Sequence, residues 1–470
     1  MSTTRPAAVA YAAALILTAA VALLLFRVPL PYQDNTLLGL PLEPSATTLF
    51  LDTMNQSGFM RPASRATSKL VFDAAAGREF AAFRTLHVLM FLALLLGAVH
   101  LMRVRTALAA ALATLALAAI LGMHPVHEAA RETDLNIKLL IPAICVGATV
   151  LAAGERRAWW RDAAALLLLV YAVMANELGL LVWVCLASAF LVGWRGVSGR
   201  AVMAGTVLVV GYLALRFVVF DVGAPGLTER GSGFGLRTYE PPELVAMFGD
   251  NPLPYYAYNV AAAAASVLFS EPRAGVFVLV REVRDGTLES GTLLNVVVST
   301  LSTLVLGWYA WRRRTAWRGW SLTHHDRLFL VAAAVVAANA VISYPYLKDV
   351  TVSGGAVFYP LALFAALHLL AADHDARPVT LGRAALVLGT IAVISCGWAV
   401  RASAFAIDMR QEAVKVRRDW ERVYDVLATD DQGQEKVDWR FVERFRAEML
   451  AMPAPAADTD PAWLTNLDPH

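Results

Sequence analysis

Charged side chains are scarce in this chain. Asp, Glu, Lys and Arg make up 17% of its 470 residues and hydrophobic residues 58%, whereas soluble domains carry about 25% charged residues. The mean hydropathy is +0.55. These values exclude an ordinary soluble protein and indicate an all-α polytopic membrane protein. The net charge of +2 and the lack of a lysine-rich tail argue against nucleic-acid binding.

Cysteine is equally rare. Cys145, Cys185 and Cys396 lie in apolar runs and do not have the Cys-x-x-Cys spacing of a metal site. We expect them to be small buried hydrophobic residues. The C-terminal region also has no repeat of about 30–45 residues, which excludes a helical-repeat domain there.

Long apolar runs dominate what is present. About eleven of them are candidates to cross a hydrocarbon core of about 30 Å. They lie at roughly 7–26, 85–102, 106–123, 137–153, 163–176, 178–194, 201–218, 292–311, 328–345, 355–372 and 384–401. The first run is longer than a signal-peptide core of about 7–15 residues, so we expect an uncleaved span. The fifth and sixth runs meet at Asn176-Glu177, which predicts a tight hairpin or broken helices.

Basic residues in the short loops predict the orientation, because they concentrate on the cytoplasmic side. One side holds Arg5, Arg103, Arg105, Arg156, Arg157, Arg161, Arg195, Arg200, Arg312, Arg313, Arg314, Arg318, Arg327, Arg377 and Arg383. The short loops of the other side hold only Arg131, Lys138 and Lys348. We therefore expect a cytoplasmic N-terminus in the inner (plasma) membrane.

Two long outer loops follow from this topology, at about 28–84 and 219–291, and their mixed composition predicts interfacial helices. One such helix is expected from Tyr255 to Phe269; if it crosses the membrane instead, the C-terminus moves inside. The spans form a transmembrane domain at 1–401. Residues 402–470 are expected to be a charged helical tail with a flexible end, since apolar positions such as Trp420, Val423 and Leu427 recur at helical spacing.

Ionisable residues gather at the outer boundary of the predicted spans. They are Asp34, Arg84, His124, His127, Glu128, Glu177 and Lys348. Each alone is more common as an interfacial anchor than as a functional group, but their shared side indicates a site. Asp34 is a candidate general base toward a hydroxyl acceptor, and Arg84 and Lys348 are candidate phosphate ligands. Glu177 has little loop around it, and such acids are functional candidates.

The segment His124-Pro125-Val126-His127-Glu128 leaves three interpretations open. The histidines could donate hydrogen bonds to a phosphate or sugar, bind a divalent metal together with Glu128, or cap the turn. Zinc requires three protein ligands and magnesium rarely uses histidine, so the metal is the lesser alternative. No cofactor is otherwise expected.

The order of these motifs resembles the polytopic GT-C glycosyltransferases, and within them the O-mannosyltransferases that combine transmembrane helices with tetratricopeptide repeats. The matching residues are Asp34; Phe83-Arg84-Thr85-Leu86; His124-Pro125-Val126-His127-Glu128-Ala129; and Asn176-Glu177. That family has an acid after its first helix, an aromatic-Arg-Pro-Leu entry, a His-Pro-x-His turn followed by Thr-Glu-Ala, and a Lys-Glu pair. The resemblance covers roughly residues 7–200.

Several departures indicate a distant relative with a different acceptor. Gln33 stands where the family often has a second acid, Thr85 replaces the proline and Asn176 replaces the lysine. The threonine after the second histidine and the repeat domain are absent.

The resemblance implies a transferase that moves a mannose-like sugar from a polyprenyl-phosphate donor, on the outer or periplasmic face, with inversion. Its acceptor would be a hydroxyl of a glycan, lipid or protein. Asp34 would be the base, and Arg84 and Lys348 would lie near the donor phosphate. His124, His127 and Glu177 would position sugar or phosphate, with Glu128 in support.

Two alternatives remain. A secondary transporter or flippase of lipid-linked sugar would place polar groups at the midplane between repeated halves. The early motifs do not recur in the second half, but His100, Arg216 and His368 lie within or near spans. The other alternative is an inactive GT-C-like scaffold, which the single acid at Asp34 would favour.

Overall fold

The computed structural model describes residues 5–32, 36–54, 61–131, 139–220, 227, 231–269, 275–375, 381–429 and 437–453. The first half of the chain contains the helices α1 (Arg5–Leu25), α2 (Thr36–Gly39), η1 (Leu40–Leu42), α3 (Ala46–Met54), α4 (Pro62–Ala75), α5 (Glu79–Met102), α6 (Ala107–Gly122), α7 (His124–Arg131), α8 (Leu140–Ala152), α9 (Trp159–Ala175), η2 (Glu177–Gly179), α10 (Leu180–Leu191), α11 (Gly199–Ala214) and the π-helical turn η3 (Leu215–Val219). The second half contains β1 (Ser232–Phe234), β2 (Arg237–Tyr239), α12 (Pro241–Phe248), α13 (Leu253–Leu268), α14 (Val278–Asp285), α15 (Ser290–Arg318), α16 (His324–Ile342), η4 (Asp349–Val352), α17 (Ser353–Asp375), α18 (Leu381–Glu421), α19 (Val423–Thr429) and α20 (Trp439–Ala451).

Seven helices of the described ranges are long and apolar enough to cross a membrane. They are α1, α5, α11 with η3, α15, α16, α17 and α18. This confirms the prediction of an all-α polytopic membrane protein. Four further predicted spans coincide with α6, α8, α9 and α10, which are only 16, 13, 17 and 12 residues long. The number of eleven spans therefore stays a prediction.

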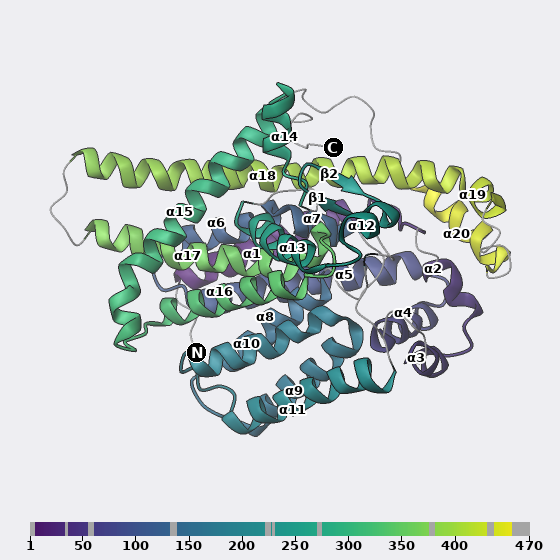
Figure 1. Cartoon of the computed structure of the whole chain (residues 1–470), viewed down its shortest axis with the longest axis horizontal. Helices are drawn as coiled ribbons and strands as arrows, with labels where there is room; N and C mark the ends of the chain where they lie inside the picture. The colour runs from purple at the N-terminus through teal and green to yellow at the C-terminus, as the bar shows by residue number, and fades with distance from the viewer. Residues whose placement is uncertain are drawn as a thin grey trace.

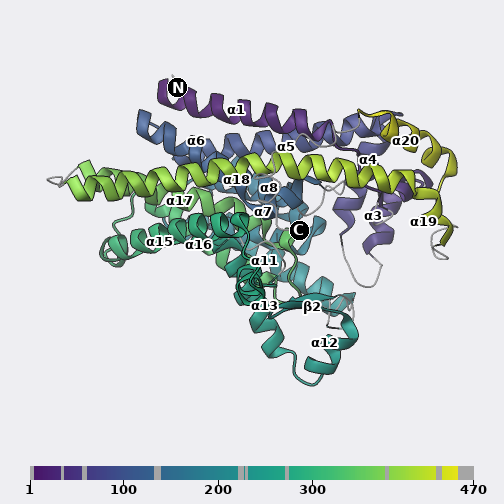
Figure 2. The ribbon, with the colours of Figure 1, turned by 90° about the horizontal axis from the view of Figure 1, so that it is seen from above.

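Helices α1, α17 and α18 run along the long axis of the molecule (Figures 1 and 2), whereas Figure 1 shows α15 crossing it obliquely. The most buried of the seven is α17, which packs against α16, α6 and α15. Asn339 of α16 fixes the start of α17. Its side-chain amide donates to the Thr351 carbonyl and accepts from the Gly355 nitrogen, both at 2.7 Å. A Cβ on Gly354 would lie 2.7 Å from Cδ1 of Leu181, so a larger residue there would force the Leu181 side chain to move.

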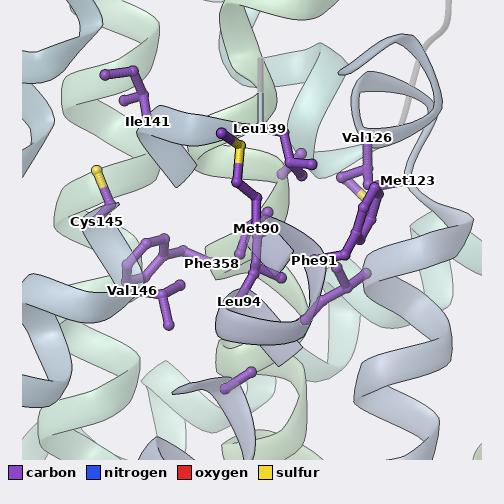
Figure 3. Packing of buried hydrophobic residues seen from close by; sticks show 14 of the residues in the cluster. Met90, Phe91, Leu94, Met123, Val126, Leu139, Ile141, Cys145, Val146 and Phe358 are labelled. Atoms are coloured by element: carbon purple, nitrogen blue, oxygen red, sulfur yellow. The ribbon is translucent and has the colours of Figure 1, made fainter. Parts of the chain in front are cut away.

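Apolar side chains fill the space between α5, α7, α8 and α17. Figure 3 shows Met90, Phe91 and Leu94 of α5 lying between Val126, Val146 and Phe358. Cys145 belongs to this core and Cys185 is also buried, as predicted, whereas Cys396 is exposed on α18. An apolar run of sequence contains exposed as well as buried positions, so the run around Cys396 did not show which kind of position this cysteine occupies.

The second long loop contains more structure than the single interfacial helix expected there. Strands β1 and β2 form an antiparallel hairpin with Ser232 opposite Tyr239, and α12, α13 and α14 follow. Helix α13 packs against α16, and Asn259 donates to the Tyr344 carbonyl at 2.9 Å. The helix predicted from Tyr255 to Phe269 is thus attached to the bundle by a buried amide.

The C-terminal helices pack on the first long loop. The predicted boundary at residue 401 falls inside α18, which continues unbroken to Glu421. The Trp420 indole then donates to the Leu30 carbonyl at 2.8 Å. On α20, Arg444 makes hydrogen bonds of 2.9 and 3.0 Å to the Glu79 carboxylate, which raise the pKa of Arg444. The end of α18 and the helix α20 therefore lie at the same end of the bundle as the first loop.

Candidate functional site

Those predicted site residues that the structure describes lie near the end of the bundle that carries the first loop, which we call the loop end. It comprises residues 28–32, α4, the start of α5, α7, η2 and the C-terminal part of α18 with α20. Among the described residues we distinguish two clusters of buried or half-buried polar side chains at this end, and each joins segments that are far apart in the sequence.

The first cluster is built on the turn between α9 and α10. Helix α9 ends at Ala175, and the side chain of the following Asn176 accepts a hydrogen bond of 2.9 Å from the Leu178 nitrogen. A Cβ on Gly179 would lie 2.2 Å from the Ala172 carbonyl, so only glycine fits this position. The expected tight junction is thus a turn that presents the Glu177 carboxylate.

Two arginines hold that carboxylate. Arg216 lies 2.8 Å from one oxygen and Arg61 lies 3.1 Å from the other. Arg216 is buried and also donates to the Tyr212 hydroxyl at 3.0 Å. Guanidinium groups donate paired hydrogen bonds to phosphate oxygens, so two arginines beside each other give the cluster donors that suit an anion such as phosphate.

Sequence reasoning missed Arg61 as a site residue, and it considered Arg216 only for transport. Arg216 could have been found, because an arginine in an apolar run is a functional candidate. Arg61 has no such signal, since it lies in a mixed loop and reaches Glu177 across 116 positions of the chain.

The second cluster centres on His127 of α7. Its Nδ1 contacts the Asp408 carboxylate of α18, its Nε2 lies 2.5 Å from the Leu121 carbonyl, and the ring meets the edge of Phe405 at 5.2 Å. Both ring nitrogens thus face oxygen acceptors, so the His127–Asp408 pair carries a proton at each contact. A metal ion could bind His127 only after one of these contacts is broken.

The metal alternative has no further support among the described residues, where no group of three His, Cys, Asp or Glu side chains is placed to hold an ion. The side chain of Glu128, the third ligand of that alternative, lies outside the described residues. His124 begins α7 with its ring 6.4 Å from that of His127.

Arg84 is fully buried one turn into α5. Its Nη2 donates to the Val28 and Pro29 carbonyls at 2.9 and 3.0 Å. Its Nε and Nη1, together with Nδ1 of His87 one turn further on, are buried and have no hydrogen-bond partner within the described ranges. Arg84 therefore fixes the segment that leads from α1 toward Asp34.

The remaining predicted residues are placed in part. Lys348 is exposed in the turn before η4, and its carbonyl accepts from the Thr351 nitrogen at 2.9 Å. Since η4 packs against α7, this turn is adjacent to the helix of His124 and His127. Asp34 lies outside the described residues. Its proximity to the two clusters therefore stays a prediction.

Replacing Glu177 by Gln is expected to lower stability by about 1–2 kcal/mol. The change leaves the buried Arg216 beside a neutral amide, and the cost is reduced because the Glu177 side chain is 25% exposed. Thermal unfolding in detergent measures the effect. Glu289→Gln, an exposed acid before α15, is the matched control; an equal effect of both changes would contradict a role for the cluster.

No family model matches the chain, and neither a curated protein nor a solved structure matches it. Its function is therefore inferred from the positions and chemistry of its own residues.

Proposed function

We propose that the protein is an inner-membrane GT-C-like glycosyltransferase with about eleven spans and a cytoplasmic N-terminus. It transfers a mannose-like sugar from a polyprenyl-phosphate donor to an acceptor hydroxyl on the periplasmic side. The observation that carries the proposal is the fixation of the chain just before Asp34, at the end of the bundle where both polar clusters lie.

That segment is held from two sides. Arg84 binds the carbonyls of Val28 and Pro29, and Trp420 binds the carbonyl of Leu30. The Tyr32 hydroxyl donates to the Asp419 carbonyl at 3.2 Å. Three consecutive carbonyls are thus occupied by side chains of α5 and α18. A general base acts efficiently when its position is fixed relative to the acceptor, and this fixation supports Asp34 as the base.

The Arg61–Glu177–Arg216 cluster suits the donor phosphate. Glu177 contacts both guanidinium groups and holds them beside each other, and guanidinium groups are strong donors to phosphate oxygens. In our proposal Lys348, on the turn beside α7, contributes a further cation. His124 and Glu128 help to position the sugar, while His127, paired with Asp408, fixes α7.

In the proposed reaction Asp34 takes the proton of the acceptor hydroxyl while its oxygen attacks the anomeric carbon. The bond between that carbon and the phosphate oxygen breaks, and polyprenyl phosphate leaves with both electrons. The configuration inverts because the oxygen enters opposite the leaving group. The phosphate gains negative charge in this step, so arginines beside it stabilise the transition state more than the ground state.

The test is donor turnover by the purified protein in liposomes. We expect polyprenyl phosphate to be released from polyprenyl-phosphate mannose when an acceptor is present, as measured by mass spectrometry of the lipid. Movement of intact donor across the bilayer without release would overturn the proposal in favour of a flippase. An absence of both would overturn it in favour of a scaffold, provided that other polyprenyl-phosphate sugars also give none.

A further inference from the structure

A second polar site lies at the opposite end of the bundle. Helix α5 connects the two ends: Arg84 is near its start and Arg103 follows its last residue. At about 1.5 Å per residue, the 24 residues of α5 separate the ends by about 36 Å. At this far end a hollow of about 400 Å³ opens between the ends of α5, α8 and α10 and the start of α16.

The hollow is lined mainly by cationic and donor groups. These include Arg103, Arg195, Arg327, Trp194 and His324, with Glu155 as the acid among its lining residues. Glu155 is 76% exposed and its carboxylate lies 3.8 Å from Arg103, so it compensates for little of the charge. Three arginines against one exposed carboxylate leave the hollow positive.

Backbone contacts shape the hollow. Arg103 donates to the Ala153 carbonyl and Arg327 to the Gly193 carbonyl, each at 3.3 Å. The loop after α10 is pinned to the end of α8, because the Gly196 nitrogen donates to the Ala152 carbonyl at 2.9 Å. A Cβ on Gly196 would lie 2.1 Å from the Leu151 carbonyl, so only glycine permits this approach. Two of the arginines are therefore held by helix-end carbonyls.

Two of the residues that line the hollow have a buried donor atom without an acceptor among the described residues. The Trp194 indole nitrogen and the Arg327 Nε are buried without a hydrogen-bond partner in the part of the chain that the structure describes. Trp194 as a whole is 5% exposed, and its ring packs against His324 at 5.7 Å. Buried donors without acceptors are costly. A ligand that brings acceptor oxygens would satisfy them.

We propose that this hollow binds a phosphate group, with the headgroup of an anionic phospholipid as the ligand that its place favours. A phosphate offers acceptor oxygens and negative charge to a site that offers donors and positive charge. Basic hollows at the ends of membrane helices suit such headgroups, and the arginine distribution predicts this end to face the cytoplasm. Inorganic phosphate offers the same acceptor oxygens and negative charge, but it lacks the acyl chains by which a phospholipid would also contact the apolar sides of the helices.

The experiment measures ligand-dependent thermal stabilisation of the full-length protein in detergent. Short-chain phosphatidylglycerol is expected to raise the unfolding temperature saturably, and phosphatidylcholine to do so much less. Inorganic phosphate is the third ligand: stabilisation by it at similar concentrations supports the site with a soluble ligand, and stabilisation by phosphatidylglycerol alone supports a lipid.

Substitutions of its arginines test whether phosphatidylglycerol stabilises the protein by binding in the hollow. Arg195→Gln and Arg327→Gln are each expected to weaken the phosphatidylglycerol response about tenfold, because a charge-assisted hydrogen bond is lost. Arg195 is exposed, so its replacement leaves the fold intact even if Arg327→Gln does not. Arg200→Gln, an exposed arginine that begins α11 at the same end, is the control. An unchanged response of Arg195→Gln, or equal responses to phosphatidylglycerol and phosphatidylcholine, would overturn the proposal.

Discussion

Asp34→Asn is expected to lower the rate of sugar transfer by about two to four orders of magnitude, the usual contribution of a general base. The amide has nearly the size of the carboxylate but cannot take the proton of the acceptor hydroxyl. Arg84 and Trp420 bind backbone carbonyls, so they hold the preceding segment equally well in the variant. The loss is therefore expected in kcat, with the donor KM nearly unchanged.

The matched control is Asp52→Asn on α3. Asp52 is an exposed acid of the same long loop, and its replacement is expected to leave transfer unchanged. Rates are compared by the release of polyprenyl phosphate from equal amounts of folded protein. Wild-type turnover by Asp34→Asn would rule out Asp34 as the base, although the protein could still be a glycosyltransferase with a different one.

Asp408→Ala is expected to destabilise the protein by about 1–3 kcal/mol, the cost of leaving a buried polar group without its hydrogen-bond partner. Asp408 and His127 are both nearly inaccessible, at 2% and 5% exposure, so water does not replace the lost carboxylate. The change also removes the hydrogen bond that joins α7 to α18, and α7 carries His124. We therefore expect transfer to fall along with the unfolding temperature.

A double-mutant cycle of Asp408→Ala with His127→Asn separates loss of the contact between these two residues from a general loss of packing. The two changes are expected to be non-additive, with a coupling energy of about 1–3 kcal/mol for residues in direct contact. Asp250→Ala, an exposed acid after α12, should leave the unfolding temperature unchanged. Fully additive losses would contradict the pairing of His127 with Asp408.

Sequence patterns predicted the features that depend on local composition. Apolar runs located the long helices, and Asn176-Glu177 located the turn that Gly179 makes possible. The helical spacing of Trp420, Val423 and Leu427 predicted a helix, and all three are buried. Their packing partner did not follow from spacing, because an apolar stripe does not specify which surface it covers. The segment predicted to be a charged tail therefore packs on the first long loop, through the end of α18 and through α20.

The partners within the site were hidden for a related reason. Glu177 was predicted, but Arg61 lies 116 positions away from it, and Asp408 lies 281 positions from His127. No period or short motif connects such residues. The β1–β2 hairpin was missed because its strands have only three residues each, too few to show an alternation of apolar and polar side chains.

The hydrogen bond between Trp420 and Leu30 joins positions 390 residues apart, which has a consequence for biosynthesis. At about 5–20 residues per second, the ribosome needs roughly 20–80 s to add that length of chain. The first loop emerges early but gains its cover only when α18 and α20 have been made. A chain terminated before α18 is therefore expected to lack the hydrogen bond that holds Leu30 in the segment before Asp34.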